Sequence, residues 1–239
     1  MLASLAALTA LAWIALLPLG QAMMPAMPGM AMAPGLSALA IGFAMWAVMM
    51  PGMMLPSAAP MTLAVARIHA ARGPGRGASL RLAAFIAGYL LVWTGFAAVA
   101  AAAQWALARA GLAAGMAGAV GRGIGAAIFL AAGAYQFSPL KLACLGACRS
   151  PLGFLLGHWR DGVAGALRMG LRHGAVCLGC CWALMALLFA VGAMNLLWVA
   201  GLGMFVLVEK LAPMGGLLAR VGGIALIAAG VALAAGVVG

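Results

Sequence analysis

Apolar runs separated by short polar gaps follow one another along the whole chain. Seven of these runs reach or approach the length of about 20 residues that a helix needs to cross a bilayer. Their approximate ranges are 2–19, 36–65, 82–107, 123–140, 174–194, 196–211 and 221–238. None of them has the pattern of a convincing strand. We therefore predict one all-α domain over residues 1–239, a polytopic transmembrane helical bundle of seven spans.

The composition supports this membrane assignment. Of the 239 residues, 68% are hydrophobic and 6% are charged, whereas an ordinary soluble domain is about a quarter charged. The chain lacks the polar side chains to cover the outside of a soluble globule, and its hydrophobicity excludes intrinsic disorder. The 35 glycines fit a bundle in lipid, where small residues let helix backbones approach closely.

The basic residues predict the orientation of the bundle. The chain has 13 Lys and Arg residues against two Asp and Glu, a net charge of +11. They lie in short gaps between apolar runs, which argues against nucleic-acid binding and is typical of topology signals. The gaps after the second, fourth and sixth runs hold four, five and two of them, and Arg109 and Arg122 fall in the other gaps. We expect a bacterial inner membrane protein with a cytoplasmic N-terminus and a periplasmic C-terminus.

Segments between the runs complete this map. We expect the first run to stay in the protein, because no Lys or Arg precedes it as in a secretory signal. Residues 21–35 form an outer loop rich in Met and Pro. Residues 141–172 are too polar to span, and their apolar side chains are typical of a cytoplasmic interfacial helix. These side chains are Leu152, Phe154, Leu155, Leu156 and Trp159. His69 lies in the basic gap before the third run, and we expect it to be solvated.

A group of cysteines in the fifth run is the strongest candidate for chemistry. Helical spacing puts Cys177 one turn before Cys180 and Cys181. His173 precedes this group by one turn, and Met185 follows it by one turn. Thiolate, thioether and imidazole are ligands that suit Cu(I), and thiolates also suit Zn(II). The alternative is that these cysteines are small buried apolar residues, but three within five positions favour metal or thiol chemistry.

A second cysteine pair follows the fourth run. Cys144 and Cys148 are four residues apart, and we expect both to be free thiols in a reducing cytoplasm. They complete a shared sulfur site if they lie on the side of Cys177; the alternative is two small residues on an interfacial helix. Arg168 and Arg172 lie near the cysteines in sequence and would favour the thiolate form.

Methionines form another set of candidate ligands. In the second run they repeat with helical spacing on two neighbouring stripes, Met45, Met49 and Met53 on one and Met50 and Met54 on the other. We expect Pro51 and Gly52 to interrupt this helix, and such breaks expose backbone carbonyls at the binding sites of transporters. The alternative is core packing, in which Met is a common gap filler.

The outer loop adds five more methionines, Met23, Met24, Met27, Met30 and Met32. In an oxidising compartment thioethers bind Cu(I) without forming disulfides, so this loop is a candidate for copper capture. The alternative is a hydrophobic loop that lies in the membrane interface.

The two acids of the chain, Asp161 and Glu209, fall in different segments. Such a scarcity of proton-transfer groups argues against hydrolysis by paired carboxylates and against an enzyme. Glu209 lies near the inner end of the sixth run, where an ionisable residue is a functional candidate. The neighbouring Lys210 faces another direction, so we expect Glu209 to pair with an arginine. Structural pairing and coupling to a proton or a metal both remain open for it.

Several stretches resemble a bacterial family of predicted metal-binding integral membrane proteins of unknown function. They are WAVMMPGMMLPSAAPM at 46–61, YQFSPLKLACLGACRSPLGFLL at 135–156, HGAVCLGCCWALM at 173–185, GAMNLLW at 192–198 and VLVEKLAP at 206–213. These stretches are spread over most of the chain after the first run. The resemblance implies a membrane protein that binds a metal, and it carries no mechanism.

The sequence thus predicts a membrane protein that binds a soft metal, Cu(I) before Zn(II), for transport, delivery or homeostasis. The outer methionines would collect the ion, the stripe of the second run would carry it inward, and the cysteines would hold it. The expected partners are the lipid bilayer, the metal ion and a membrane or periplasmic protein. One alternative is a thiol-disulfide relay through Cys177 and Cys180, and another is a structural subunit of a membrane complex.

Overall fold

The structure is a computed structural model, and it describes residues 7, 9–16, 18, 35–72, 75–114 and 118–237. The helices are α2 (Leu36–Ala71), α3 (Arg76–Arg109), α4 (Arg122–Tyr135), α5 (Pro139–Arg149), α6 (Pro151–His158), α7 (Gly162–Val191), α8 (Leu196–Leu211) and α9 (Gly215–Ala234). Residues 9–16 are helical too. The all-α prediction is confirmed. The methionines expected to capture copper, at positions 23–32, lie outside the described residues.

Helix length supports a membrane protein without fixing the number of spans. Four of the described helices, α2, α3, α7 and α9, are long and apolar enough to cross a membrane, and α4 with α5, which meet at 64°, make a fifth candidate. α8 has 16 residues, fewer than the roughly 20 that a crossing needs. The first predicted span is described only in part. Seven spans, one domain and the orientation therefore stay predictions.

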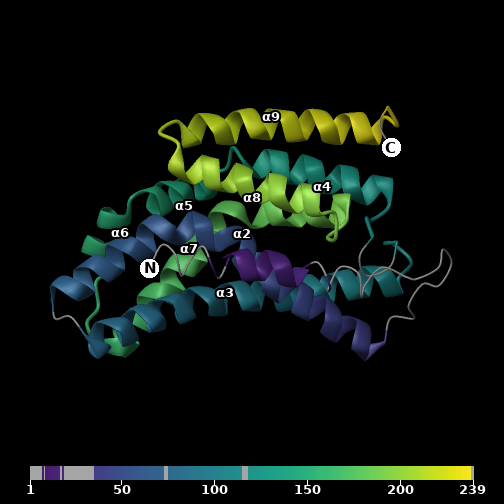
Figure 1. The fold of residues 1–239 in the computed structure, drawn as a ribbon. Coiled ribbons are helices and arrows are strands. Elements are labelled where there is room, and N and C mark those ends of the chain that lie inside the picture. Colours follow the sequence, from purple (N-terminus) through teal and green to yellow (C-terminus); the bar gives the residue numbers. More distant parts are fainter. Residues whose placement is uncertain are drawn as a thin grey trace.

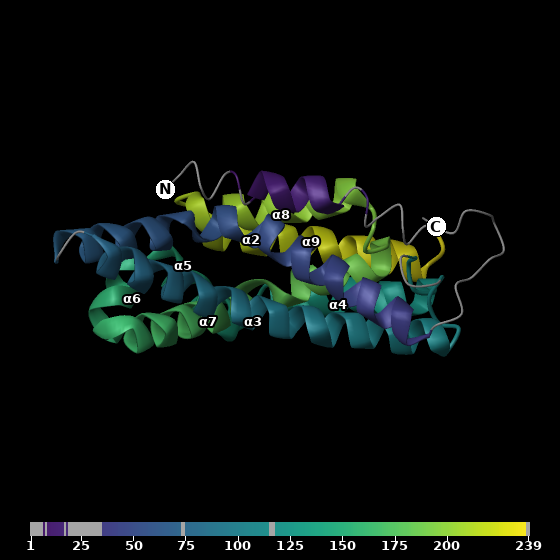
Figure 2. The ribbon, with the colours of Figure 1, turned by 60° about the horizontal axis from the view of Figure 1, so that its bottom comes forward.

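The helices stack in layers, with α9 and α4 on one side, α3 on the other, and α8, α2 and α7 between them (Figure 1). α3 packs along α7 and α2, and α4 packs along α9. Figure 2 shows α3 and α7 running side by side over most of their length. Glycine permits this approach: a Cβ on Gly88 would overlap the backbone of Leu167, and a Cβ on Gly170 would overlap that of Phe85.

The interruption predicted in the second run is wrong, because α2 continues through Pro51, Pro56 and Pro60 as one helix of 36 residues. Each proline lacks the N–H that would bond the carbonyl four residues earlier, yet packing against α3 and α8 keeps the helix intact. The Tyr89 hydroxyl of α3 donates to the carbonyl oxygen of Met54 at 3.2 Å. The methionine stripe therefore stays on one continuous helical face.

The predicted interfacial segment, 141–172, is not a single helix. It contains most of α5, all of α6 and the first turns of α7, which begins at Gly162 instead of near residue 174. α6 buries Phe154 and Leu155 against neighbouring helices, and its position relative to a membrane surface is untested. His69, expected to be solvated, is 2% exposed and lies 5.1 Å from the Trp159 ring, because α6 and the following turn cover the end of α2.

Arginines gather toward the end of the bundle where α2 meets α3 and α6 meets α7. There an Arg72 Nη1 atom lies 2.8 Å from an Asp161 oxygen. These arginines are Arg67, Arg72, Arg76, Arg81, Arg149, Arg160, Arg168, Arg172 and Arg220. Lys141 and Lys210, counted from the sequence among the inner gaps, are instead buried within the bundle at 0% and 6% exposure. Their burial means that they are not the loop cations that the count from the sequence assumed.

Candidate metal centre

The three cysteines of α7 point into the bundle. Cys177, Cys180 and Cys181 are each 0% exposed, because the side of α7 that carries them packs against the other helices. The Sγ atom of Cys181 lies 3.8 Å from the Sδ atom of Met54 on α2. Two helices far apart in the sequence therefore bring thiol and thioether sulfur into direct contact.

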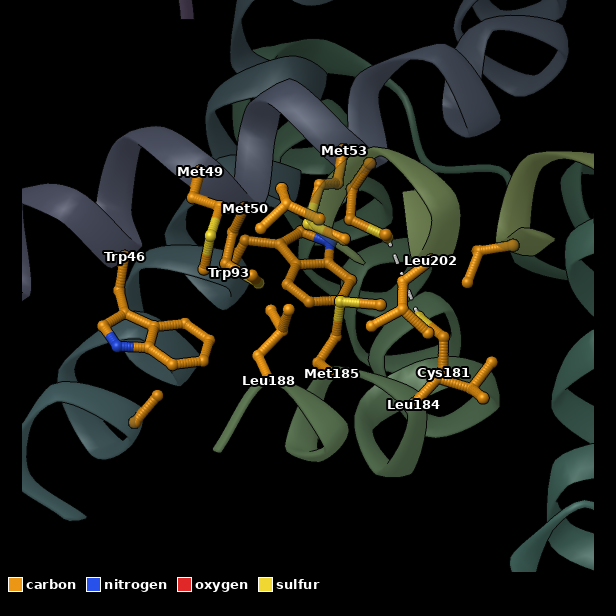
Figure 3. Packing of buried hydrophobic residues seen from close by; sticks show 14 of the residues in the cluster. Trp46, Met49, Met50, Met53, Trp93, Cys181, Leu184, Met185, Leu188 and Leu202 are labelled. Atoms are coloured by element: carbon orange, nitrogen blue, oxygen red, sulfur yellow. Dashed lines mark hydrogen bonds between the residues drawn. The ribbon is translucent and has the colours of Figure 1, made fainter. Parts of the chain in front are cut away.

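The predicted methionine ligands belong to the same buried cluster as these thiols. On α2 they are Met49, Met50, Met53 and Met54, all buried. Met185 of α7 is buried as well, and Figure 3 shows Met185 and Cys181 rising from α7 toward the α2 methionines, with the Trp93 ring among them. Packing of α2 against α7 thus places these sulfurs in one buried cluster, and their role as metal ligands stays a prediction.

Cys177 has two polar partners that the sequence did not indicate. The Lys210 Nζ atom of α8 lies 3.0 Å from its Sγ atom, and the Tyr89 hydroxyl of α3 lies 3.2 Å from the same sulfur. The Lys210 ammonium also donates to the Ser57 hydroxyl of α2 at 3.1 Å. Arg168 and Arg172, expected to favour the thiolate, are exposed on the outer side of α7. The cation beside the thiols is therefore Lys210.

The two cysteines of α5 differ in their surroundings. The half-buried Cys148 lies close enough for its thiol to interact with those of Cys177 and Cys180, so it joins the α7 group. Cys144 is half-buried, and its sulfur lies over Gly179, 2.8 Å from where a Cβ would stand. The expected shared site therefore gains a fourth thiol from Cys148, while Cys144 packs at its edge.

A second buried lysine lies close to the thiols. The Lys141 Nζ atom of α5 lies 2.8 Å from an oxygen of Glu209, and both side chains are 0% exposed. The same ammonium donates to the carbonyl oxygen of Cys180 at 3.0 Å. The other carboxylate oxygen of Glu209 is buried without a partner among the described residues. The expectation that Glu209 pairs with an arginine is wrong, because α5 crosses α8 with Lys141 toward it.

The buried charges imply the ionisation state of the thiol group. Lys141 and Lys210 bring two positive charges into the interior, and Glu209 brings one negative charge. An uncompensated buried charge costs several kcal/mol. A thiolate at Cys177, in contact with the Lys210 ammonium, makes the group neutral, and the thiolate is the form that binds metals.

His173 lies one helical turn from Cys177 in an aromatic enclosure. Its ring centroid is 6.0 Å from that of Phe85, 5.6 Å from that of Tyr89 and 5.5 Å from that of Phe154. The side chain is 2% exposed, and neither ring nitrogen has a hydrogen-bond partner within the described part of the chain. A buried imidazole with both nitrogens unpaired is costly, which makes His173 available to a ligand.

Comparison with known proteins identifies the family. A family model described as "PpoB2: Copper chaperone" matches residues 43–233, a range that contains every cysteine and every buried charge described above. The chain belongs to this copper chaperone family. Its function is therefore related to copper, and a chaperone family points to a non-catalytic role. The metal-binding part of the family resemblance is supported, and its membrane and bacterial parts stay predictions. Neither the curated proteins nor the solved structures contain a match.

The thiols are gathered but not arranged as a finished metal site. No three Cys, His, Asp or Glu side chains in the described ranges converge on a point suited to a metal ion. Cys180 and Cys181 instead donate to the Cys177 carbonyl oxygen, at 3.1 and 3.0 Å. Rotating these side chains about χ1 would release both sulfurs. Sulfurs that share an ion at about 2.3 Å lie roughly 3.8 to 4.6 Å apart, and the Cys181–Met54 pair is at the short end of that range.

The sequence did not indicate four polar residues around the thiols, namely Ser57, Tyr89, Lys141 and Lys210. Two signals were present. A Lys at position 141 stands between apolar residues of an otherwise hydrophobic helix, and a buried ammonium needs a partner. Tyr89 stands in a run of small and apolar residues, where a hydroxyl also needs a partner. Their pairing with the cysteines had no local signal.

Proposed function

We propose that this chain is an integral membrane copper chaperone that holds Cu(I) at the thiols of α7 and α5 and passes it to a partner protein. The observation that carries the proposal is the buried group of Cys177, Cys180 and Cys181, in which Cys181 contacts Met54 and which the half-buried Cys148 adjoins. Thiolate and thioether sulfur select Cu(I) over harder ions. The match to a copper chaperone family supports copper as the cargo.

The thioether beside the thiols favours Cu(I) over Zn(II). Structural zinc sites use Cys, His or carboxylate ligands, whereas the Sδ atom of Met54 lies 3.8 Å from the Sγ atom of Cys181. Cu(I) accepts two or three sulfur ligands and tolerates a thioether among them. Cys181 with Met54, together with one thiolate of Cys177 or Cys148, provides such a set within side-chain rotation.

Loading can keep the buried charge constant. Before binding, a thiolate at Cys177 balances the Lys210 ammonium. When Cu⁺ enters and a second thiol gives up its proton to solvent, the ion with two thiolates carries one negative charge, which Lys210 still balances. One proton leaves for each Cu⁺ bound, and no net charge is added to the interior. Lys210 keeps its contact with Ser57 throughout.

The order of the ligands along the bundle sets the direction in which Cu(I) would move. The methionine stripe of α2 leads along the bundle to Met54 and the thiols, and thiolates hold Cu(I) more strongly than thioethers. His173 stands one turn beyond Cys177 and offers a further ligand on the way to the arginine-rich end. With no ATP-binding motif in the sequence, movement is downhill or driven by exchange with a partner protein.

Copper content tests the proposal directly. The full chain is purified from copper-supplemented cells, and the metal is measured by elemental analysis in the wild type and in Cys177→Ser/Cys180→Ser/Cys181→Ser. Ala164→Ser/Ala175→Ser, which places serines on the exposed side of α7, is the matched control. We expect copper in a fixed ratio to the wild-type and control proteins and a near-complete loss in the triple variant. Equal copper in all three, or none in the wild type, overturns the proposal.

The contact of Cys148 with Cys177 and Cys180 also favours a second candidate, a thiol-disulfide relay. Neighbouring thiols of this kind can exchange disulfides with a partner. Trapping of thiols in intact cells separates the two functions. A disulfide between any two of these three cysteines in untreated cells supports the relay, and fully reduced cysteines in the copper-loaded protein support the chaperone.

A further inference from the structure

A cavity of about 230 Å³ lies where α6 turns into α7, apart from the thiol group. Its lining is mainly polar, and it consists of Gly157, His158, Trp159, Arg160, Arg168, Met169 and Arg172. Three of these seven residues are arginines, and each carries a guanidinium group. The proposed copper site uses none of them.

The backbone builds this cavity in a defined way. The turn after α6 folds back over the first turns of α7, where a Cβ on Gly165 would stand 2.7 Å from the Arg160 carbonyl oxygen. The Arg160 N–H donates to the Met169 Sδ atom at 3.4 Å, which fixes the turn on the helix. Arg168 and Arg172 follow one helical turn apart. Arginines from the turn and from the helix thus line the same space.

The His158 ring is also held in place. Its Nδ1 atom lies 2.9 Å from the Phe154 carbonyl oxygen. A carbonyl only accepts hydrogen bonds, so Nδ1 carries the proton. This leaves Nε2 as the remaining polar atom of a ring that lines the cavity.

The positive charge of the cavity exceeds what the two acids of the chain balance. Only Asp161 adjoins the cavity, directly after Arg160. Asp161 receives hydrogen bonds from Arg72 and Trp159, and Glu209 pairs with Lys141 on the other side of α7. Like charges one helical turn apart destabilise a helix. An anion from outside the chain would remove this repulsion.

We propose that this cavity binds a phosphate group, supplied by the headgroup of an anionic phospholipid. Guanidinium groups form paired hydrogen bonds with phosphate oxygens, and basic pockets between helices on the cytoplasmic side bind lipid headgroups. Leu152 and Leu156 on the outer side of the adjoining α6 are 67% and 88% exposed, as expected for side chains beside acyl chains. The inference rests on the membrane location and does not depend on copper binding.

Thermal unfolding of the full chain in neutral detergent provides the test, because a ligand that binds the folded state raises Tm. The protein is titrated with short-chain phosphatidylglycerol, short-chain phosphatidylcholine and inorganic phosphate. The variant Arg168→Gln/Arg172→Gln removes two guanidinium groups from the cavity. Arg122→Gln/Arg220→Gln is the matched control, with the same change in net charge at exposed positions elsewhere.

We expect phosphatidylglycerol to stabilise the wild type and the control at far lower concentration than phosphatidylcholine. In the cavity variant the apparent affinity for phosphatidylglycerol should fall about thirtyfold. Arg168→Lys/Arg172→Lys keeps the charge but loses the paired hydrogen bonds, so it should fall between the two. Equal responses of the cavity variant and the control overturn the proposal.

The phosphate arm identifies the source of the group. Stabilisation by inorganic phosphate that phosphatidylglycerol does not exceed assigns the cavity to a free phosphate, and a larger effect of the lipid assigns it to the membrane. No response to either, in a wild type that still binds copper, overturns the inference and leaves the proposed copper function standing.

Discussion

The two buried lysines of this protein lie in neighbouring regions and have different anions. Lys141 of α5 faces a carboxylate, with its Nζ atom 2.8 Å from Glu209. Lys210 of α8 faces no carboxylate, and its Nζ atom lies 3.0 Å from the sulfur of Cys177. Both ammonium groups lie in the interior, where a charge needs an opposite charge. The comparison teaches that a cysteine takes the place of the missing acid beside Lys210.

This difference assigns the two regions different tasks. The Lys141–Glu209 pair ties α5 to α8, and we infer that it is structural, because each charge already has its opposite in the pair. In the proposed function, the Lys210–Cys177 pair instead holds a charged sulfur ready for an ion. One pair would then stabilise the fold, and the other would prepare a site for cargo.

Lys141→Met should produce the largest effect on stability. It leaves the Glu209 carboxylate buried without a cation, and loss of one partner of a buried pair costs about 3–5 kcal/mol. Denaturant or thermal unfolding in detergent measures the loss. The double variant Lys141→Met/Glu209→Met should recover most of it, and a single variant as stable as the wild type would contradict a structural role.

Cys177→Ser should remove most of the bound copper while it destabilises the protein less than Lys141→Met does. The serine hydroxyl can still accept a hydrogen bond from Lys210, but it supplies no sulfur ligand. Elemental analysis and unfolding of the same preparation measure both quantities. Retained copper, or a loss of stability equal to that of Lys141→Met, would place Cys177 with the structural pair.

Lys210→Met tests whether the ammonium supports copper binding or only blocks the sulfur. If Lys210 balances a copper-dithiolate centre, its loss should weaken copper binding by about ten- to a hundredfold, the range expected for a hydrogen bond to a charged group. Competition with a Cu(I) chelator of known affinity measures the change. The variant Lys210→Gln, which also lacks the charge, should show the same loss of copper affinity. Tighter binding in both variants would show that the ammonium competes with copper.

Substitution of the two cysteines of α5 should change copper binding less than the changes at Cys177 and Lys210. Cys148→Ser should weaken copper binding, because this thiol contacts Cys177 and Cys180, whereas Cys144→Ser should change it much less. The same chelator competition compares the two variants. A larger effect at Cys144 would mean that α5 presents its other side to the ion.

The smallest effect is expected from the thioether. Met54→Leu keeps the volume of the core and should cost less than about 1.5 kcal/mol of stability, while it removes the sulfur 3.8 Å from Cys181. Copper binding should weaken modestly. Met204→Leu, an exposed position on α8, is the control, and equal behaviour of the two would remove Met54 from the set of ligands.

The sequence predicted the helices and which sulfurs share a helical face, because both follow from local periodicity. Cys177 and Cys181 stand four residues apart, so one helical face had to carry both. The partners of the lysines were out of reach for the opposite reason. Lys141 and Glu209 are 68 residues apart, and only the packing of α5 on α8 makes them neighbours. Glu209 and Lys210, although adjacent in sequence, have different partners, the Lys141 ammonium and the Cys177 sulfur.

The same limit explains the misplaced His69 and the continuous α2. A basic gap suggested solvent around His69, but α6 folds back and covers it with Trp159. Pro51 with Gly52 suggested a break, but the neighbouring helices hold α2 in one piece. In each case tertiary packing overrides the local preference.

X-ray absorption at the copper K-edge tests the central claim most directly, because it reports the atoms bound to the ion. The purified, copper-loaded wild type should show a first shell dominated by sulfur, at about 2.3 Å, and Cys177→Ser/Cys180→Ser/Cys181→Ser should lack it. A wild-type shell made of nitrogen and oxygen, unchanged in the triple variant, would contradict the assignment of the buried thiols as the copper site.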